Sequence, residues 1–164
     1  MSEQAALAAE ILGLYRVSGL TLAIAESCTG GLIAATLTEI AGSSDVVERG
    51  FVTYADQAKT DMLGVPSALI IAHGAVSEPV ARAMAAGALE HSPADVSVAV
   101  TGIAGPGGAT PEKPVGLVHL AALRRGRQTH HERHVFAGDR AQVRLSAVIS
   151  ALTMVKQLAD QEEP

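Results

Sequence analysis

Tryptophan is absent from this 164-residue chain, which also contains only two Tyr, two Phe and one Cys. A single cysteine cannot form an internal disulfide, and it is compatible with the reducing cytoplasm, where we expect the protein. So few aromatic rings provide no stacking platform for bases. The formal net charge of −5 also argues against the basic face that non-specific nucleic-acid binding requires. We therefore expect no nucleic-acid partner.

Long hydrophobic runs are missing as well. No apolar run approaches the ~20 residues needed to cross a bilayer, and the opening stretch MSEQAALAAEILGLY lacks the basic region of a signal peptide. We therefore expect no membrane partner. Hydrophobic residues nevertheless make up 48% of the chain, enough to offset the entropy cost of ordering it. The length suits a single domain over residues 1–164.

Helical and strand-like patterns alternate along the chain. Helices are predicted over residues 4–18, 30–41, 57–63, 77–91 and about 140–160, and strands over 21–25, 46–54, 96–100, 116–123 and 129–136. This alternation is typical of a layered α/β domain. The last two strands are separated by a short basic turn, which indicates a hairpin and hence a mixed sheet. Because open α/β sheets bind ligands beyond the carboxyl ends of their strands, the exits at 25–31 and 100–108 are the candidate sites.

The first strand exit reads AESCTGG and contains Ser27, Cys28 and Thr29. A serine at a strand end before a helix points outward, and the N–H groups that follow it suit an oxyanion hole. Taken alone, the pattern also fits a turn in which Ser27 or Thr29 caps the next helix, and such caps are common. Cys28 is not expected to be a nucleophile, because no His lies in a related motif and small buried cysteines are usually inert.

A nucleophilic serine needs a base, and the stretch after the second strand offers Tyr54 and Lys59. Lysine can remove a proton if burial or neighbouring cations lower its pKa enough to leave the amine neutral. Tyr54 could orient the pair or relay a proton. A solvated lysine on a helix face is the commoner arrangement, and nothing in the sequence places Lys59 next to Ser27.

Two further features could hold an anion. The loop after the third strand reads TGIAGPGG, residues 101–108. Its glycines would let backbone N–H groups approach a phosphate, although a plain flexible loop has the same composition. Arg140 follows Asp139 near a helix start, so it could bind phosphate or carboxylate bidentately or simply pair with Asp139. Arg144 lies one turn further on, and its role is left open.

Three histidines resemble a metal-binding cluster: His130, His131 and His134. On a strand, the first and third point to one face and His131 points to the other. We therefore expect no shared ion and no metal site here, and the role of these side chains is left open.

Taken together, the motifs resemble those of the CinA C-terminal-domain family, whose best-defined members are nicotinamide-nucleotide amidases. The matching stretches are AESCTGG, IAGSSDVVERGFVTYADQAK, HGAVSEPVARAMAAGAL, TGIAGPGG, KPVGLVHLA and FAGDRAQVR. They occur in the family's order and spacing from about residue 10 to 155. Six ordered motifs are far more specific than any one of them, so the resemblance favours the functional interpretation of each.

The resemblance implies a three-layer α/β/α domain with a mixed, mostly parallel sheet of about five to six strands. It also implies hydrolysis of nicotinamide mononucleotide to nicotinate mononucleotide and ammonia, without a metal or other cofactor. The family's nucleophile corresponds to Ser27, and its catalytic tyrosine and lysine correspond to Tyr54 and Lys59. The candidate substrate-binding residues are Thr29, Gly30, Gly31, Thr101, Gly102, Ala104, Gly105 and Arg140.

Two alternatives to this activity stay open. The chain could be a non-catalytic nucleotide-binding or regulatory module that keeps the pocket, or a Ser/Lys hydrolase of another amide. In every case the expected partner is a small molecule. For the amidase and for the non-catalytic module this small molecule is a nucleotide. Assembly as a homodimer is also considered.

Overall fold

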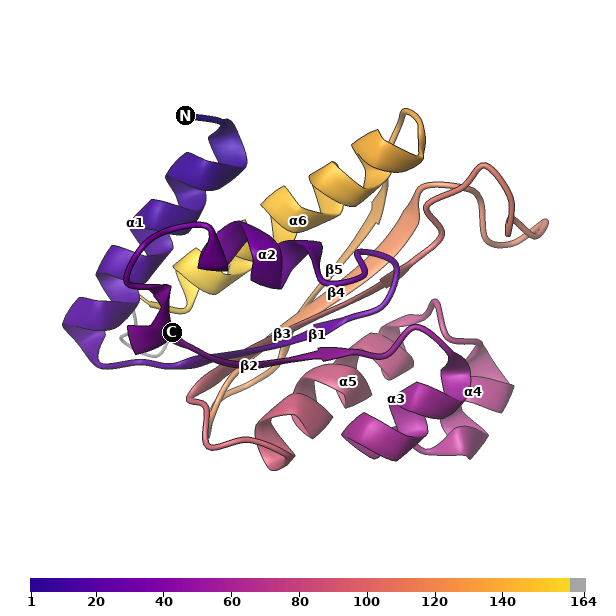
Figure 1. The fold of residues 1–164 in the computed structure, drawn as a ribbon. Coiled ribbons are helices and arrows are strands. Elements are labelled where there is room, and N and C mark those ends of the chain that lie inside the picture. Colours follow the sequence, from indigo (N-terminus) through magenta and orange to yellow (C-terminus); the bar gives the residue numbers. More distant parts are fainter. Residues whose placement is uncertain (160–164) are drawn as a thin grey trace.

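A five-stranded sheet forms the middle layer of the molecule, and helices cover both of its faces (Figure 1). The computed structural model describes residues 1–159. Across the sheet the strands follow the order β2 (Val47–Val52), β1 (Leu22–Glu26), β3 (Val96–Gly102), β4 (Leu117–Arg124) and β5 (His130–Val135). Strand β1 is parallel to β2 and β3, whereas β4 is antiparallel to β3 and β5. Four strands therefore run in one direction and β4 runs in the other.

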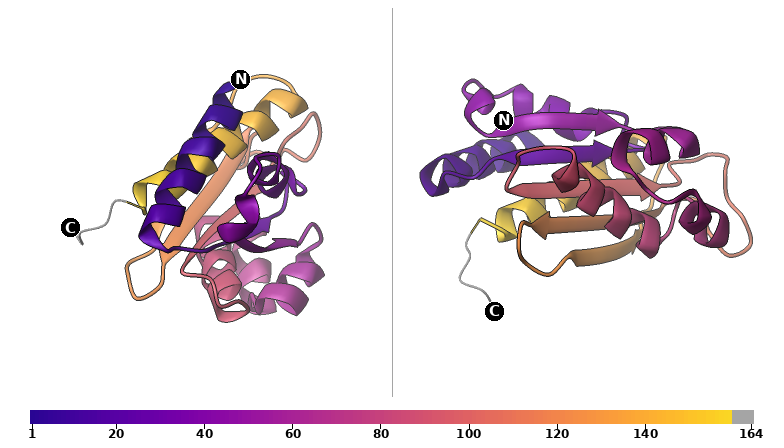
Figure 2. Two further views of the ribbon diagram at one scale, coloured as in Figure 1. Left: turned by 60° about the vertical axis from the view of Figure 1, so that its left-hand side comes forward. Right: turned by 90° about the horizontal axis from the view of Figure 1, so that it is seen from below.

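The helices fall into two layers, as Figure 1 and Figure 2 show. One face carries α1 (Glu3–Ser18), α2 (Leu32–Thr38) and α6 (Arg140–Gln157), and the other carries α3 (Asp56–Leu63), α4 (Ser67–His73) and α5 (Glu78–Glu90). A short 3₁₀ turn, η1 (Ser43–Asp45), leads into β2. The predicted α/β fold with a mixed, mostly parallel sheet is confirmed.

Several predicted boundaries need correction. The helix predicted over 30–41 begins later, because Gly30 and Gly31 have φ values of 58° and 103° and lie outside the right-handed helical region. The strand predicted over 46–54 leaves the sheet after Val52. Helix α4 was not predicted, since seven residues give too few turns for a clear period. The predicted end of the last helix near residue 160 lies outside the described residues.

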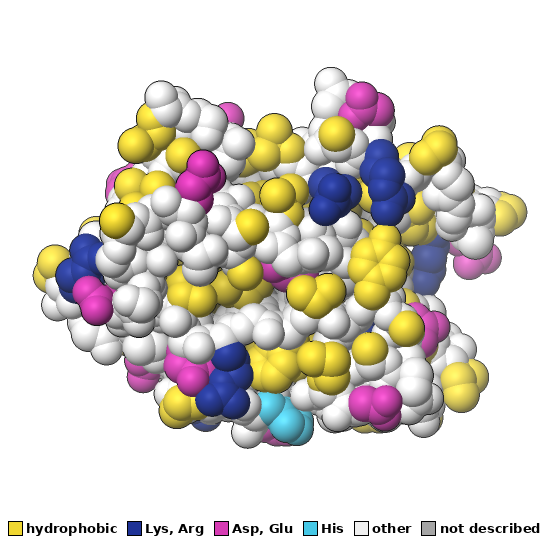
Figure 3. Space-filling model, viewed as in Figure 1, with side chains coloured by type: hydrophobic (Ala, Val, Ile, Leu, Met, Phe, Trp, Pro, Cys, Tyr) yellow, Lys and Arg dark blue, Asp and Glu magenta, His cyan; other side chains and the backbone are white. Residues whose placement is uncertain are grey.

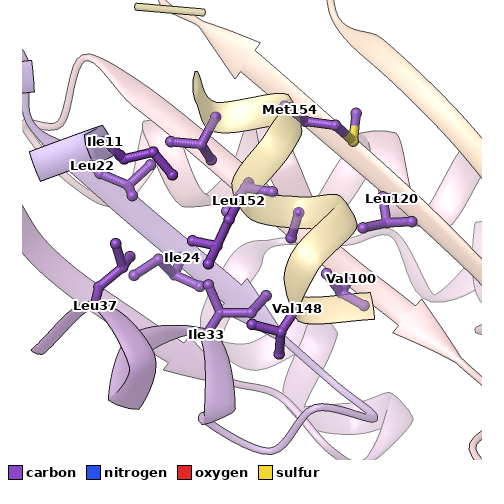
Figure 4. Packing of buried hydrophobic residues seen from close by; sticks show 14 of the residues in the cluster. Ile11, Leu22, Ile24, Ile33, Leu37, Val100, Leu120, Val148, Leu152 and Met154 are labelled. Atoms are coloured by element: carbon purple, nitrogen blue, oxygen red, sulfur yellow. The ribbon is translucent and has the colours of Figure 1, made fainter. Parts of the chain in front are cut away.

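The two faces of the sheet pack different side chains. Large aliphatic residues fill the space between the sheet and the layer of α1, α2 and α6; Figure 4 shows among others Ile11, Leu22, Ile24, Ile33, Val148 and Leu152. The opposite face presents small residues, including Ala23, Ala25, Ala99 and Ala121. Small side chains let α5 approach the sheet closely, and a Cβ at Gly87 of α5 would collide with the backbone oxygen of Leu63. The missing side chain at Gly87 therefore allows the end of α3 to approach α5 closely.

Parallel pairing brings three strand exits to one edge of the sheet. Glu26, the last residue of β1, pairs with Val52 on one side and with Val100 on the other. The chain that follows β1 therefore lies between the chain that follows β2 and the last residues of β3. This edge is where the predicted site residues meet.

Candidate active site

Ser27 begins the turn that follows β1 and is 8% exposed. Its N–H donates to the carbonyl of Val100 (3.0 Å), and its carbonyl accepts from the N–H of Gly30 (3.0 Å). The turn is thus bonded both to the neighbouring strand and to itself. These bonds hold the hydroxyl of Ser27 at the edge of the sheet.

Glu26, immediately before Ser27, is a residue that sequence reasoning missed. Its carboxylate is 1% exposed and accepts hydrogen bonds from the N–H groups of Ile33 (2.9 Å) and Ala34 (3.1 Å) at the start of α2. A carboxylate is favourable at a helix N-terminus. These two N–H groups are therefore already bonded. Only N–H groups of the turn itself remain as donors for the expected oxyanion hole. An acidic residue ending an apolar strand just before a helix was the available signal.

Lys59 of α3 points back to this edge and meets Ser27. Its Nζ lies 3.1 Å from Ser27 Oγ, 2.8 Å from the carbonyl oxygen of Thr53 and 3.4 Å from that of Tyr54. The lysine is 1% exposed, which is uncommon for this residue type. The two carbonyls and the hydroxyl receive all three N–H groups of the ammonium form.

Burial lowers the pKa of Lys59, while the charge of Asp56 at the start of α3 raises it. A lower pKa increases the fraction of neutral amine at working pH. A neutral amine would accept the hydroxyl proton of Ser27 across the same 3.1 Å contact. The arrangement can therefore generate a serine nucleophile.

Cys28, next to Ser27, does not have the character of a reactive thiol. Burial raises the pKa of its thiol to about 11, which keeps it protonated and unreactive at neutral pH. Within residues 1–159, no backbone carbonyl accepts from the N–H groups of Cys28 and Ala104, although the N–H of Cys28 also contacts its own thiol. Both residues line the pocket described next, so these N–H groups can serve a ligand.

A pocket of about 280 Å³ opens above Ser27 and Lys59. The predicted site residues that line it are Ser27, Tyr54, Lys59, Thr101, Gly102, Ala104, Gly105 and Arg140. The others, Thr29, Gly30 and Gly31, do not line it. The side chain of Thr29 points inward, where its hydroxyl is buried without a partner among the described residues. Thr101 also faces the protein, because its hydroxyl donates to the carbonyl of Ala75 (2.9 Å).

Arg140 and Tyr54 form the rim of this pocket. The Arg140 guanidinium donates to the Gly105 carbonyl (2.8 Å) and to the hydroxyl of Tyr54 (3.0 Å). Asp139 is not its partner, because the Asp139 carboxylate caps α6 by accepting from the N–H of Gln142 (2.9 Å). Figure 3 shows basic side chains together on the surface beside the start of α6. Tyr54 is 58% exposed, and its hydroxyl faces Arg140 rather than the Ser27–Lys59 pair.

The histidines lie elsewhere. His131 contacts His119 of β4, with 2.9 Å between Nδ1 of His119 and Nε2 of His131, whereas His134 pairs with Glu132 (2.9 Å) and stacks on Phe136. No group of three or more His, Cys, Asp or Glu side chains within residues 1–159 could hold a metal ion. Over the same range, no helix has the length and apolar character that a membrane crossing requires.

Curated relatives match this chain closely over part of their length. The CinA-like protein of Akkermansia muciniphila is 61% identical over 125 residues, which cover 76% of this chain and 30% of that protein. The CinA-like protein of Citrifermentans bemidjiense is 56% identical over 144 residues, covering 88% of this chain and 34% of that protein. The chain thus spans about a third of the length of these relatives.

Solved structures match over the whole described fold. The competence/damage inducible protein CihA from Agrobacterium tumefaciens is 50% identical, with a TM-score of 0.95 and 98% of both chains covered. The competence damage-inducible protein A (ComA) from Klebsiella pneumoniae is 38% identical, with a TM-score of 0.93, covering 98% of this chain and all of that one (100%).

The family profile described as the CinA C-terminal domain matches residues 4–159. This range contains every strand, every helix apart from the first residue of α1, and all the residues of the pocket. The chain belongs to the CinA C-terminal domain family.

Proposed function

We propose that the protein is an amidohydrolase that converts nicotinamide mononucleotide to nicotinate mononucleotide and ammonia, with Ser27 as nucleophile and Lys59 as base. The observation that carries this proposal is the 3.1 Å contact between Ser27 Oγ and the buried Lys59 Nζ below an open pocket. A hydroxyl beside an amine of lowered pKa is the minimal pair for covalent amide hydrolysis.

The reaction proceeds in two halves. Lys59 takes the proton of Ser27 as the oxygen attacks the carboxamide carbon, and the N–H of Cys28, from which no backbone carbonyl of residues 1–159 accepts, donates to the negatively charged carbonyl oxygen. The C–N bond then breaks, and Lys59 returns the proton so that ammonia leaves and an ester to Ser27 remains. Water attacks the ester with Lys59 again as base, which releases the carboxylate and restores Ser27.

The remote end of the nucleotide carries a negatively charged phosphate, and the pocket rim carries complementary positive charge. Arg140 offers a guanidinium at the rim, and the loop after β3 offers the free N–H of Ala104. Guanidinium groups and backbone N–H groups are favoured phosphate partners. Because the protein is acidic overall, a bound anion has to be held by local groups such as these.

Ammonia release from nicotinamide mononucleotide tests the proposal directly. Ser27→Ala should lower kcat by roughly a thousandfold or more, and Cys28→Ala, which alters the adjacent side chain, should keep most of the activity. Mass spectrometry of the wild-type protein with substrate should detect an acyl group on Ser27. Normal turnover by Ser27→Ala would contradict the proposal. Binding without turnover by the wild type would favour a non-catalytic nucleotide-binding module.

A further inference from the structure

Arg144 reaches the nucleophile turn from a helix far away in the sequence. Its Nε donates to the carbonyl of Cys28 (3.2 Å), and its Nη2 donates to the carbonyl of Thr29 (3.0 Å). Helices α2 and α6 lie on the same face of the sheet (Figure 1, Figure 2), which brings the half-buried Arg144 beside the turn. Arg144 does not line the pocket, so it contacts the turn and not the space above Ser27.

These two hydrogen bonds fix the orientation of whole peptide groups in the turn, not only of the two carbonyl oxygens. In a trans peptide the C=O and N–H groups point in opposite directions, so a bound carbonyl also sets the direction of the next residue's N–H. Holding the Thr29 carbonyl orients the N–H of Gly30, which donates to the carbonyl of Ser27 (3.0 Å). That bond in turn orients the N–H of Cys28, from which no backbone carbonyl in the described part of the chain accepts.

We propose that Arg144 is a positioning residue for Ser27: its guanidinium fork holds the Cys28 and Thr29 carbonyls, and thereby aims both the Ser27 hydroxyl and the Cys28 N–H at the pocket. The planar fork suits this task, because it presents its donors in fixed directions, whereas the single ammonium of a lysine does not. The proposal rests on the proposed function only for its kinetic readout, since the positioning would serve attack on any amide.

The test compares Arg144→Ala and Arg144→Lys with Arg125→Ala. Arg125 also donates to backbone carbonyls, those of Leu89 (2.9 Å) and Ala94 (2.7 Å), but at the opposite edge of the sheet. Each variant is checked for folding by circular dichroism and thermal melting. Three readouts follow: the labelling rate of Ser27 by a fluorophosphonate, steady-state kinetics with nicotinamide mononucleotide, and amide hydrogen exchange of residues 27–31.

For Arg144→Ala we expect a fall in kcat and in labelling rate of roughly 10- to 100-fold, which is the usual cost of a displaced reacting group. KM should stay within about twofold, because the residue does not face the pocket, and exchange in the turn should become faster. Arg144→Lys should lie between Arg144→Ala and the wild type. Guanidinium ion added to Arg144→Ala should restore part of the labelling rate, and Arg125→Ala should match the wild type.

A folded Arg144→Ala variant with wild-type labelling and exchange would overturn the positioning role. An effect confined to KM would do so as well, since it would mean that Arg144 binds substrate. If the wild type releases no ammonia but labels at Ser27 in an Arg144-dependent way, the proposed function fails while the positioning role stands. If Ser27 of the wild type does not label, amide exchange of residues 27–31 is the deciding measurement. Faster exchange in Arg144→Ala would support the positioning role, and unchanged exchange would overturn it.

Discussion

Two regions of the molecule contain a buried nitrogen base, and only one of them has the parts of an active site. At the edge of the parallel strands, Lys59 contacts the hydroxyl of Ser27 below a pocket. On the face covered by α5, His119 contacts His131, which lies 3.6 Å from Glu78 at the start of that helix. Burial is the main cause that lowers the pKa of Lys59, of His119 (to about 4) and of His131.

The difference lies in what each base faces. Lys59 contacts a hydroxyl and lines the pocket, whereas the ring of His119 stacks on that of His131. Neither histidine lines the pocket above Ser27. A lowered pKa marks a candidate functional group, but chemistry also requires a nucleophile and access for a substrate. Only the Lys59 region supplies all three.

The sharpest way to break this comparison is to change Lys59 while keeping its charge. Lys59→Arg should be as damaging as Lys59→Met, with each lowering kcat by roughly 10²- to 10⁴-fold, because a guanidinium cannot give up its proton at working pH. Rates of ammonia release measure the effect. Lys156→Arg is the matched control, since Lys156 only pairs with Glu10 (2.8 Å) on the surface.

The same comparison predicts the pH dependence of the wild type. Because burial lowers the pKa of Lys59, kcat/KM should rise with pH through an ionisation below the usual value for lysine.

Near-normal turnover by Lys59→Arg would show that the residue supplies positive charge alone. Tyr54, whose hydroxyl now contacts Arg140, would then have to be tested as the base.

An intermediate effect is expected at the pocket rim. Arg140→Ala should raise KM for nicotinamide mononucleotide by roughly 10- to 100-fold, the value of one or two charge-assisted hydrogen bonds, and change kcat little. Tyr54→Phe should raise KM less, since it removes only the 3.0 Å partner of Arg140. Free nicotinamide should be a poor substrate for every form. Equal turnover of nicotinamide and its nucleotide would contradict a phosphate-anchored pocket.

The smallest effect on activity is expected at His119, whose contribution is to pH-dependent stability. Its pKa falls from 6.5 to about 4 on folding, so the unfolded chain binds more protons between these values and stability must decrease as pH falls through this window. The loss from pH 7 to pH 5 should be about 2 kcal/mol. His119→Gln, which does not titrate, should flatten that dependence in urea titrations.

Turnover at neutral pH should remain within about twofold in His119→Gln, because the side chain does not touch the pocket. A large loss of kcat in the folded variant would show that the His119 region is coupled to the Lys59 region. Thr101 could transmit such coupling, because it pairs with His119 across β3 and β4 and also lines the pocket.

Much of the fold was within reach of the sequence because its signals are local. Alternating apolar runs and helical periods predicted each strand and every helix except α4, with shifted ends. The hairpin of β4 and β5 followed from its short turn. Strand exits marked the candidate site, and eight of the eleven predicted site residues line one pocket.

What the tertiary structure decided are the contacts between residues far apart in the chain. Ser27 and Lys59 are 32 residues apart, and Cys28 and Arg144 are 116 apart. Periodicity reports which face of an element is buried, but it carries no information on which strands become neighbours or in what register. Those choices buried Lys59, a residue type usually found on the surface, and paired His131 with His119. The sequence by itself determined the parts, and strand order and register decided which of them touch.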